Sequence, residues 1–144
     1  MTQQLITIER VALMQSVGFF AGVPTRVIAS VARLADEIEM DTGETLIVES
    51  EEGDCLYVIV RGRVRIEKNG RVIAELGAGD VVGELAVLSP GPRYASAVTL
   101  EPSLFLRLGD EVVTELLLDH PQVTRGIIDV LVRRLRQSET DVPV

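Results

Sequence analysis

A carboxylate and a guanidinium, Glu84 and Arg93, stand nine positions apart in a segment whose other residues are apolar or small. A guanidinium can donate two parallel hydrogen bonds to the oxygens of a phosphate. A carboxylate repels a phosphate, but it accepts hydrogen bonds from a sugar hydroxyl. The pair therefore predicts a site for a ligand that carries both groups, a sugar phosphate.

The residues around this pair predict a turn, a short helix and a new strand. We expect one strand to end at Gly83, a short helix over residues 84–88, a stop at Pro90 and a strand from about Tyr94. The free N–H groups at a helix start suit an anion, and glycine lets a ligand approach the backbone closely. Arg93 follows a proline and precedes small residues, so we expect its side chain to be positioned.

Each of these residues also has an ordinary interpretation. On its own, Arg93 would be a surface ion-pair residue, and Glu84 would be an acid that stabilises the first turn of a helix. The segment has neither the lysine and hydroxyl pair of a Walker loop nor the glycine pattern of a dinucleotide fold. The order of the whole segment, more than any single residue, favours the anion site.

Short β-rich runs separated by glycines fill residues 37–108. Asn69-Gly70 between two of them indicates a hairpin, because a type I′ turn needs a positive φ at both positions. Many short strands with glycine turns predict an antiparallel β-barrel, that is, a jelly roll or double-stranded β-helix. The expected strands are Thr45–Val48, Leu56–Val60, Arg63–Glu67, Val72–Leu76, Tyr94–Thr99 and Leu104–Leu108.

Helices are expected on both sides of this mainly β region. Residues 5–35 predict two helices, with Pro24 in the first turn of the second. The apolar residues of that second helix fall on one face, and they are Val27, Ile28, Val31 and Leu34.

The C-terminal helices are expected over residues 110–137, with Asp110 as a cap and a break at His120-Pro121. Ile127, Ile128, Leu131 and Leu135 either pack on the barrel or form a seam between two copies. We predict one domain over residues 1–137, with the cassette at 83–96, and a flexible tail over 138–144.

Composition excludes several classes of protein. One cysteine rules out an internal disulfide framework, and one histidine weakens a metal-dependent enzyme on a cupin-like barrel. A net charge of −8 argues against nonspecific nucleic-acid binding. The chain shows no membrane span and no signal peptide, so we expect a cytoplasmic protein with no nucleic-acid or membrane partner.

Residues 83–96 resemble the phosphate-binding cassette of the cyclic nucleotide-binding domain family. That family includes catabolite activator protein, the regulatory subunits of cyclic-AMP-dependent protein kinase and cyclic-nucleotide-gated channels. The resemblance runs from about Phe19 to Leu135. It is carried by Gly83-Glu84-Leu85-Ala86, Pro92-Arg93, Ala95-Ser96, and upstream by Gly43-Glu44-Thr45-Leu46-Ile47, Gly53-Asp54, Leu56-Tyr57-Val58-Ile59 and Arg61-Gly62-Arg63-Val64.

The resemblance implies roles for the residues of the cassette. Glu84 would bind the ribose 2′-hydroxyl, with Gly83 close to the ribose, and Arg93 would bind the cyclic phosphate. The backbone N–H groups of Ala86 and Tyr94 would complete the phosphate cradle. Leu85 and Ala95 complete the predicted ligand-binding set, and Val64 and Leu76 would line the pocket for the base.

Tyr94 departs from the family pattern, in which the residue after the arginine is usually small. A threonine there tends to favour cyclic GMP, and Tyr94 does not fit that rule. We therefore expect cyclic AMP to be favoured over cyclic GMP as the ligand, with no other cofactor.

The resemblance implies a non-enzymatic sensor or regulatory module. Its ligand would shift a population between two arrangements of the terminal helices. The effector domain or partner protein is not identified, and a homodimer through the C-terminal helix is one expectation. The alternatives are a structural or dimerisation module with a vestigial cassette, or a sensor of another phosphate-bearing ligand such as a cyclic dinucleotide.

Three further features have ordinary structural interpretations. Arg133, Arg134 and Arg136 suit the end of a helix, although one of them could instead fold over the base as a lid. Cys55 is expected to be a small buried hydrophobe, and haem ligation by it is a minor alternative. His120 is expected to cap a helix or lie on the surface.

Overall fold

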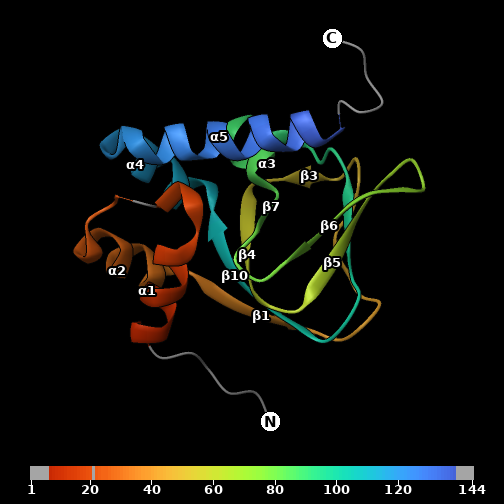
Figure 1. The fold of residues 1–144 in the computed structure, drawn as a ribbon, viewed down its shortest axis with the longest axis horizontal. Helices are drawn as coiled ribbons and strands as arrows, with labels where there is room; N and C mark the ends of the chain where they lie inside the picture. The colour runs from red at the N-terminus through yellow and green to blue at the C-terminus, as the bar shows by residue number, and fades with distance from the viewer. Residues whose placement is uncertain (1–6, 21, 139–144) are drawn as a thin grey trace.

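The structure is a computed structural model that describes residues 7–20 and 22–138, with helices grouped beside a small β-barrel (Figure 1). The helices are α1 (Thr7–Ser16), α2 (Thr25–Leu34), α3 (Glu84–Leu88), α4 (Asp110–Asp119) and α5 (Pro121–Ser138), with a 3₁₀ turn η1 (Gly18–Phe20). The strands are β1 (Asp36–Met40), β2 (Thr45–Ile47), β3 (Glu52–Gly53), β4 (Cys55–Arg61), β5 (Arg63–Lys68), β6 (Arg71–Gly77), β7 (Val81–Val82), β8 (Gly91–Pro92), β9 (Ser96–Thr99) and β10 (Ser103–Gly109).

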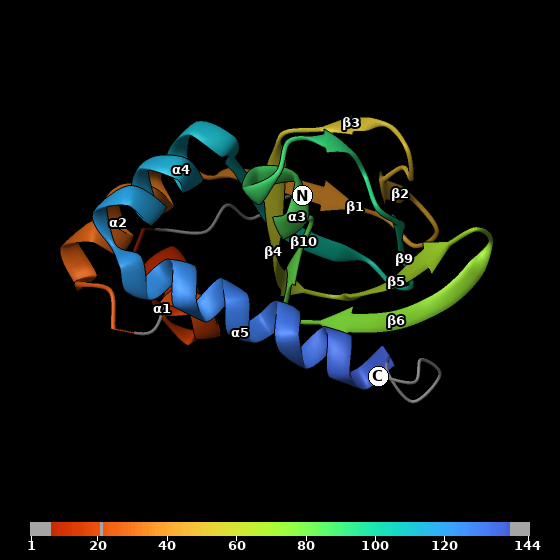
Figure 2. The ribbon, with the colours of Figure 1, turned by 90° about the horizontal axis from the view of Figure 1, so that it is seen from above.

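Two four-stranded antiparallel sheets form the β region. Their strand orders are β1-β10-β4-β7 and β2-β9-β5-β6, and β3 pairs with β8 beside them. The expected antiparallel jelly roll with flanking helices is confirmed. Viewed from above, α1, α2 and α4 lie to one side of the sheets, and α5 runs from that side past α3 toward β6 (Figure 2).

Alternation along β4 and β10 divides the core into two apolar clusters. Leu56 and Val58 of β4 face the helices, together with Leu106 and Leu108 of β10. Ile59 of β4 and Phe105 of β10 point the opposite way, into the barrel, where they pack with Ile47, Val64, Val82 and Ala97. Because successive side chains of a strand point to opposite faces, Cys55, Tyr57 and Arg107 share the inward parity.

The predicted hairpin is confirmed at residues 69 and 70. Asn69 has a φ of 52° and Gly70 a φ of 76°, as the turn requires. The turn places Lys68 opposite Arg71, and a register shift between Ile66 and Glu67 then places Val64 opposite Leu76.

Three details of the helices differ from the sequence predictions. The apolar face predicted for α2 is only partly buried, because Ile28 and Val31 are buried but the side chain of Leu34 is 61% exposed. Pro24 lies just outside α2 as its N-cap residue, and Gly109 rather than Asp110 precedes α4. The break at His120 is confirmed, because His120 ends α4 and α5 begins at the next residue.

The C-terminal helix α5 has one buried side and one exposed side. Ile127 is almost fully buried, whereas Ile128 and Leu135 are more than half exposed. Ser138 still belongs to α5, although we expected the tail to begin there; the other residues of the predicted tail lie outside the described ones. None of the helices within the described ranges combines the length and apolar character needed to cross a membrane.

Arg10 fastens the N-terminal helix to the start of the barrel. Its guanidinium donates to the carbonyl oxygens of Ala32 at 2.9 Å and Ala35 at 2.7 Å, and it lies 3.4 Å from Glu37. These acceptors end α2 and begin β1, so one side chain joins three segments.

We predict that Arg10→Ala lowers the free energy of unfolding by about 1–3 kcal/mol, because buried acceptors lose a charged donor. Urea denaturation monitored by circular dichroism measures this, with exposed Arg33→Ala as the matched control. Equal stability of the two variants would contradict the structural role of Arg10.

Candidate functional site

Gly83 forms the turn from which the candidate site is built. It is the N-cap residue of α3 and has φ 85° and ψ 16°, a left-handed conformation that favours glycine. Its carbonyl oxygen accepts hydrogen bonds from Ala86 N at 3.2 Å and from Arg93 Nη1 at 3.3 Å. A Cβ at this position would lie 2.6 Å from Arg93 Nη1, so the turn also leaves room for the guanidinium.

The backbone of Arg93 is held by the segment before β3. Arg93 N donates to Glu51 O at 2.8 Å, and Arg93 O accepts from Ser50 N at 2.9 Å. Both main-chain groups of the arginine are therefore fixed by neighbouring residues, which gives its long side chain a defined starting point.

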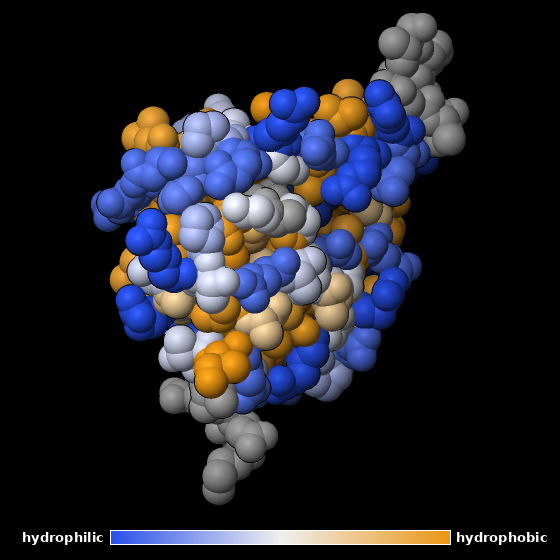
Figure 3. Space-filling model, turned by 60° about the vertical axis from the view of Figure 1, so that its left-hand side comes forward, coloured by the Kyte–Doolittle hydropathy of each residue, from blue (hydrophilic) through white to orange (hydrophobic). Residues whose placement is uncertain are grey.

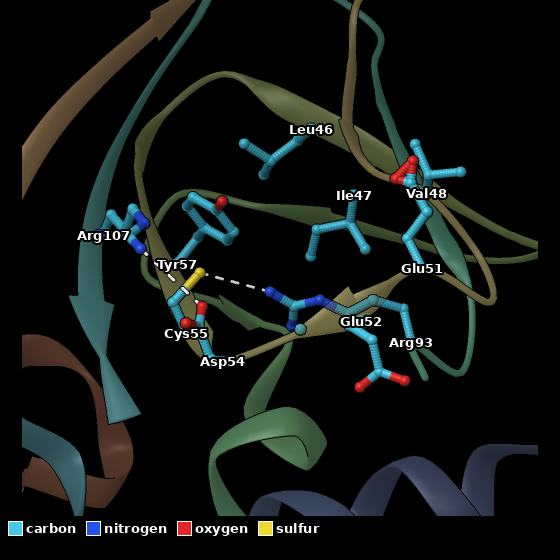
Figure 4. A pocket seen from close by; sticks show the side chains of 11 residues that line it. Leu46, Ile47, Val48, Glu51, Glu52, Asp54, Cys55, Tyr57, Arg93 and Arg107 are labelled. Carbon is cyan, nitrogen blue, oxygen red and sulfur yellow. Dashed lines mark hydrogen bonds and ion pairs between the residues drawn. The ribbon is translucent and has the colours of Figure 1, made fainter. Parts of the chain in front are cut away.

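The side chain of Arg93 extends across Gly53 toward the start of β4. A Cβ on Gly53 would lie 2.0 Å from Arg93 Nε, so the absence of a side chain there makes the path available. At its end, Arg93 Nη2 donates to the Cys55 sulfur at 3.3 Å (Figure 4). The expectation that Arg93 is positioned rather than free is confirmed.

The guanidinium faces a cavity of about 220 Å³. Tyr57, Arg107 and the Cys55 sulfur lie at one end of it, and Ile47 and Leu46 lie above the guanidinium (Figure 4). Cys55 and Tyr57 of β4 and Arg107 of β10 reach this cavity because they occupy the alternate strand positions whose side chains point into the barrel. The remaining lining residues are Val48, Glu51, Glu52, Gly53 and Asp54.

The inner end of the cavity is electrostatically unusual. Burial raises the pKa of the Tyr57 phenol to about 12, and its hydrogen bond with Cys55 adds to the effect. The pKa of the Arg107 guanidinium is also raised, chiefly by the nearby Cys55 sulfur. Arg107 pairs with Asp36 at 3.4 Å and Asp54 at 3.9 Å. The Tyr57 phenol therefore stays neutral and the Arg107 guanidinium stays charged at ordinary pH.

The Glu84 carboxylate does not pair with Arg93 but with an arginine of α5. Only 4% of Glu84 is exposed, and its Oε1 forms an ion pair with Nη1 of Arg134 on α5. Arg134 Nη2 also donates to the carbonyl oxygen of Val81, the first residue of the preceding strand β7. The other carboxylate oxygen, Glu84 Oε2, is buried and has no hydrogen-bond partner among the described residues.

Comparison with known proteins decides the family. The family model described as cyclic nucleotide-binding domain matches residues 37–120, more than half of the chain. The chain belongs to this family. Within the parts of this cyclic nucleotide-binding domain that the structure describes, no group of three or more His, Cys, Asp or Glu residues could hold a metal ion.

Three relatives illustrate the similarity. The domain is 32% identical over 139 residues to the CRP-like cAMP-activated global transcriptional regulator of Mycobacterium tuberculosis, covering 88% of this chain and 62% of that protein. It is 30% identical over 110 residues to the cAMP-dependent protein kinase regulatory subunit of Yarrowia lipolytica, covering 76% and 29%. The crystal structure of Thermus thermophilus catabolite activator protein superposes with a TM-score of 0.76 at 28% identity, covering 87% and 61%.

The structure brings some of the predicted site residues together and separates others. Gly83, Ala86 and the Arg93 guanidinium meet at the Gly83 carbonyl, whereas the Glu84 carboxylate turns to α5. Leu85 and Tyr94 are about half exposed. Ala95 and Leu76 are partly buried, and Val64 is fully buried.

Sequence reasoning did not single out several residues that shape this site. Arg134 was one of three equivalent arginines, and Gly53 was quoted only as part of a motif. Arg107 carried a signal that could have been used, since an arginine alternates there with Leu106 and Leu108 in an otherwise apolar strand.

We predict that the domain loses stability between about pH 10 and pH 12 through Tyr57. The folded state raises the pKa of this phenol from 10.0 to about 12, so the stabilisation is complete below pH 10 and is lost as the pH approaches 12. Melting temperatures measured from pH 8 to 12 should fall more steeply for the parent than for Tyr57→Phe, with Tyr94→Phe as the control. Parallel curves for all three proteins would contradict the prediction.

Proposed function

We propose that this domain binds a cyclic mononucleotide, cyclic AMP in preference to cyclic GMP, and passes the binding signal to α5. The observation that carries the proposal is the buried Oε2 of Glu84, which has no hydrogen-bond partner within residues 7–20 and 22–138. Leaving a buried acceptor unsatisfied costs about 1–3 kcal/mol, and more for a charged group. A ligand hydroxyl would satisfy this oxygen, and the ribose 2′-hydroxyl has the required donor.

Arg93 would supply the phosphate contact. Its guanidinium donates to the Gly83 carbonyl oxygen and to the Cys55 sulfur, each at 3.3 Å. Hydrogen bonds between a guanidinium and an anionic oxygen are shorter, about 2.7–2.9 Å, and about twice as strong as neutral ones. A cyclic phosphate beside Gly83 would therefore draw the guanidinium to better acceptors, with the backbone N–H groups of Ala86 and Tyr94 nearby.

The names of the relatives and the character of residue 94 support cyclic AMP. The Mycobacterium tuberculosis regulator is described as cAMP-activated, and the Yarrowia lipolytica relative as the regulatory subunit of a cAMP-dependent protein kinase. Tyr94 lacks the short hydroxyl side chain that tends to favour cyclic GMP in this family. Its ring instead lies against the ammonium group of Lys68, 4.1 Å from Nζ.

The Arg134 contact supports a route for the signal. Arg134 joins the ligand-binding carboxylate to α5, and it also holds the Val81 carbonyl next to the cassette. A donor arriving at Oε2 would weaken the hold of the carboxylate on Arg134, because the same charge would then serve two partners. The ligand would shift the position of α5 by the difference in its affinity for the two arrangements.

A non-binding structural module is the second candidate. The observation that favours it is that Arg93 already has partners, so its position does not require a ligand. Isothermal titration with cyclic AMP, cyclic GMP and a cyclic dinucleotide separates the candidates. Binding of a cyclic mononucleotide supports the first proposal, and no heat with any of the three would support the second.

We predict that Arg93→Ala weakens cyclic AMP binding by about 2–5 kcal/mol, the usual cost of removing one partner of a buried charge pair. Gly53→Ala should also weaken binding, because its methyl group displaces the guanidinium without removing the charge. Isothermal titration measures both, and Arg125→Ala, an exposed arginine of α5, is the control. Parent-like affinity of Arg93→Ala would show that the phosphate is held elsewhere.

A further inference from the structure

Lys68, at the tip of the β5–β6 hairpin, contacts the end of the cassette in two ways. Its Nζ donates to the Tyr94 carbonyl oxygen at 2.9 Å, and it lies 4.1 Å from the centroid of the Tyr94 ring. An ammonium over an aromatic face is attracted by the ring quadrupole. The same lysine therefore holds both the main chain and the side chain of the residue that follows Arg93.

Lys68 also reaches the segment between β2 and β3. Its Nζ lies 3.6 Å from Glu49 Oε2, and the other oxygen of that carboxylate accepts from Asn69 N at 3.0 Å. Glu49 N donates in turn to Ser96 Oγ at 2.8 Å, at the start of β9. We call the contacts of Lys68 with Glu49 and Tyr94 the Lys68 clamp.

The clamp surrounds the backbone of Arg93. Ser50 and Glu51 follow Glu49 and make both main-chain hydrogen bonds to Arg93, while Tyr94 follows Arg93 directly. The exposed ion pair of Lys68 with Glu49 alone contributes little to stability. Lys68 adds a hydrogen bond and a ring contact with Tyr94, the residue that follows Arg93. The hairpin tip therefore restrains the two segments between which Arg93 starts.

We infer that Lys68 is a positioning residue for the ligand site. It acts through Tyr94 and Glu49: it keeps the Tyr94 ring against the hairpin and fixes the main chain at residues 93 and 94. The Arg93 guanidinium and the Tyr94 N–H are then presented together to the ligand phosphate. This inference rests on the proposed binding of a cyclic mononucleotide.

The test compares cyclic AMP affinity in three variants by isothermal titration. Lys68→Met keeps a long side chain but removes the charge and the donors, and we expect binding about 5- to 30-fold weaker than in the parent. Lys68→Arg keeps the cation and the donors and should restore most of the affinity. Arg71→Met removes a positive charge from the residue opposite Lys68 in the same hairpin and should bind like the parent.

A spectroscopic measurement follows the clamp directly. The chain has two tyrosines and no tryptophan, so ¹³C-labelled tyrosine gives separate ring signals for Tyr57 and Tyr94. Without ligand, Lys68→Met should shift the Tyr94 signal and leave Tyr57 in place, and Lys68→Arg should shift Tyr94 less. Melting temperatures of all variants confirm that each is folded.

Several outcomes would overturn the inference. They are parent-like affinity of Lys68→Met, an unmoved Tyr94 signal in that variant, or an equal loss of affinity in Arg71→Met, which would indicate a general charge effect. If the parent binds none of the cyclic nucleotides, the proposed function itself fails and the role of Lys68 fails with it. A parent that binds while Lys68→Met binds equally well removes the positioning role alone.

Discussion

The buried carboxylate of Glu84 is the constraint on which the rest of the site depends. A carboxylate that is 4% exposed loses most of its hydration, and removing its partner typically costs about 3–5 kcal/mol. Arg134 provides that partner from α5, fifty residues along the chain. The side chain of Glu84 is therefore held by α5. The pairing uses one carboxylate oxygen, while the other has no hydrogen-bond partner among the described residues. The same burial thus creates both the link to the helix and the demand for a donor.

The geometry around that carboxylate follows from local features of the chain. The left-handed conformation of Gly83 reverses the chain into α3 and exposes the carbonyl that Arg93 contacts. The alternation of β4 directs Cys55 and Tyr57 into the cavity that the guanidinium enters. A missing side chain at Gly53 leaves the path open. The site therefore depends on the turn at Gly83, on the alternation of side chains along β4 and on the lack of a side chain at Gly53, and each of these is a local property of the sequence.

The sequence could predict what depends on short-range patterns. The Asn69-Gly70 hairpin and the short helix after Gly83 were both predicted because turn chemistry acts over a few residues. It could not predict that Glu84 pairs with Arg134, or that Arg93 crosses Gly53, because these contacts join residues 40 to 50 positions apart and nothing local selects one partner among several.

Leu34 shows the limit of periodicity. The helical pattern of α2 places Leu34 beside Val31, but it does not say how far the neighbouring helix covers that face. In the structure, Leu34 lines an open groove of about 580 Å³ between α2 and α4, so it stays exposed. The helical side of the molecule accordingly brings hydrophobic side chains to the surface between hydrophilic ones (Figure 3).

The most direct measurement uses the ligand rather than the protein to remove the contact at Glu84. Isothermal titration of the parent with cyclic AMP and with its 2′-deoxy analogue isolates the ribose hydroxyl, and Glu84→Gln repeats the comparison without the carboxylate charge. We expect the parent to prefer cyclic AMP about 10- to 100-fold, since the analogue leaves a buried charged acceptor unsatisfied, and we expect this preference to narrow in Glu84→Gln. Equal affinity of the parent for the two ligands, or an unchanged preference in the variant, would contradict the assignment of Glu84 to the sugar.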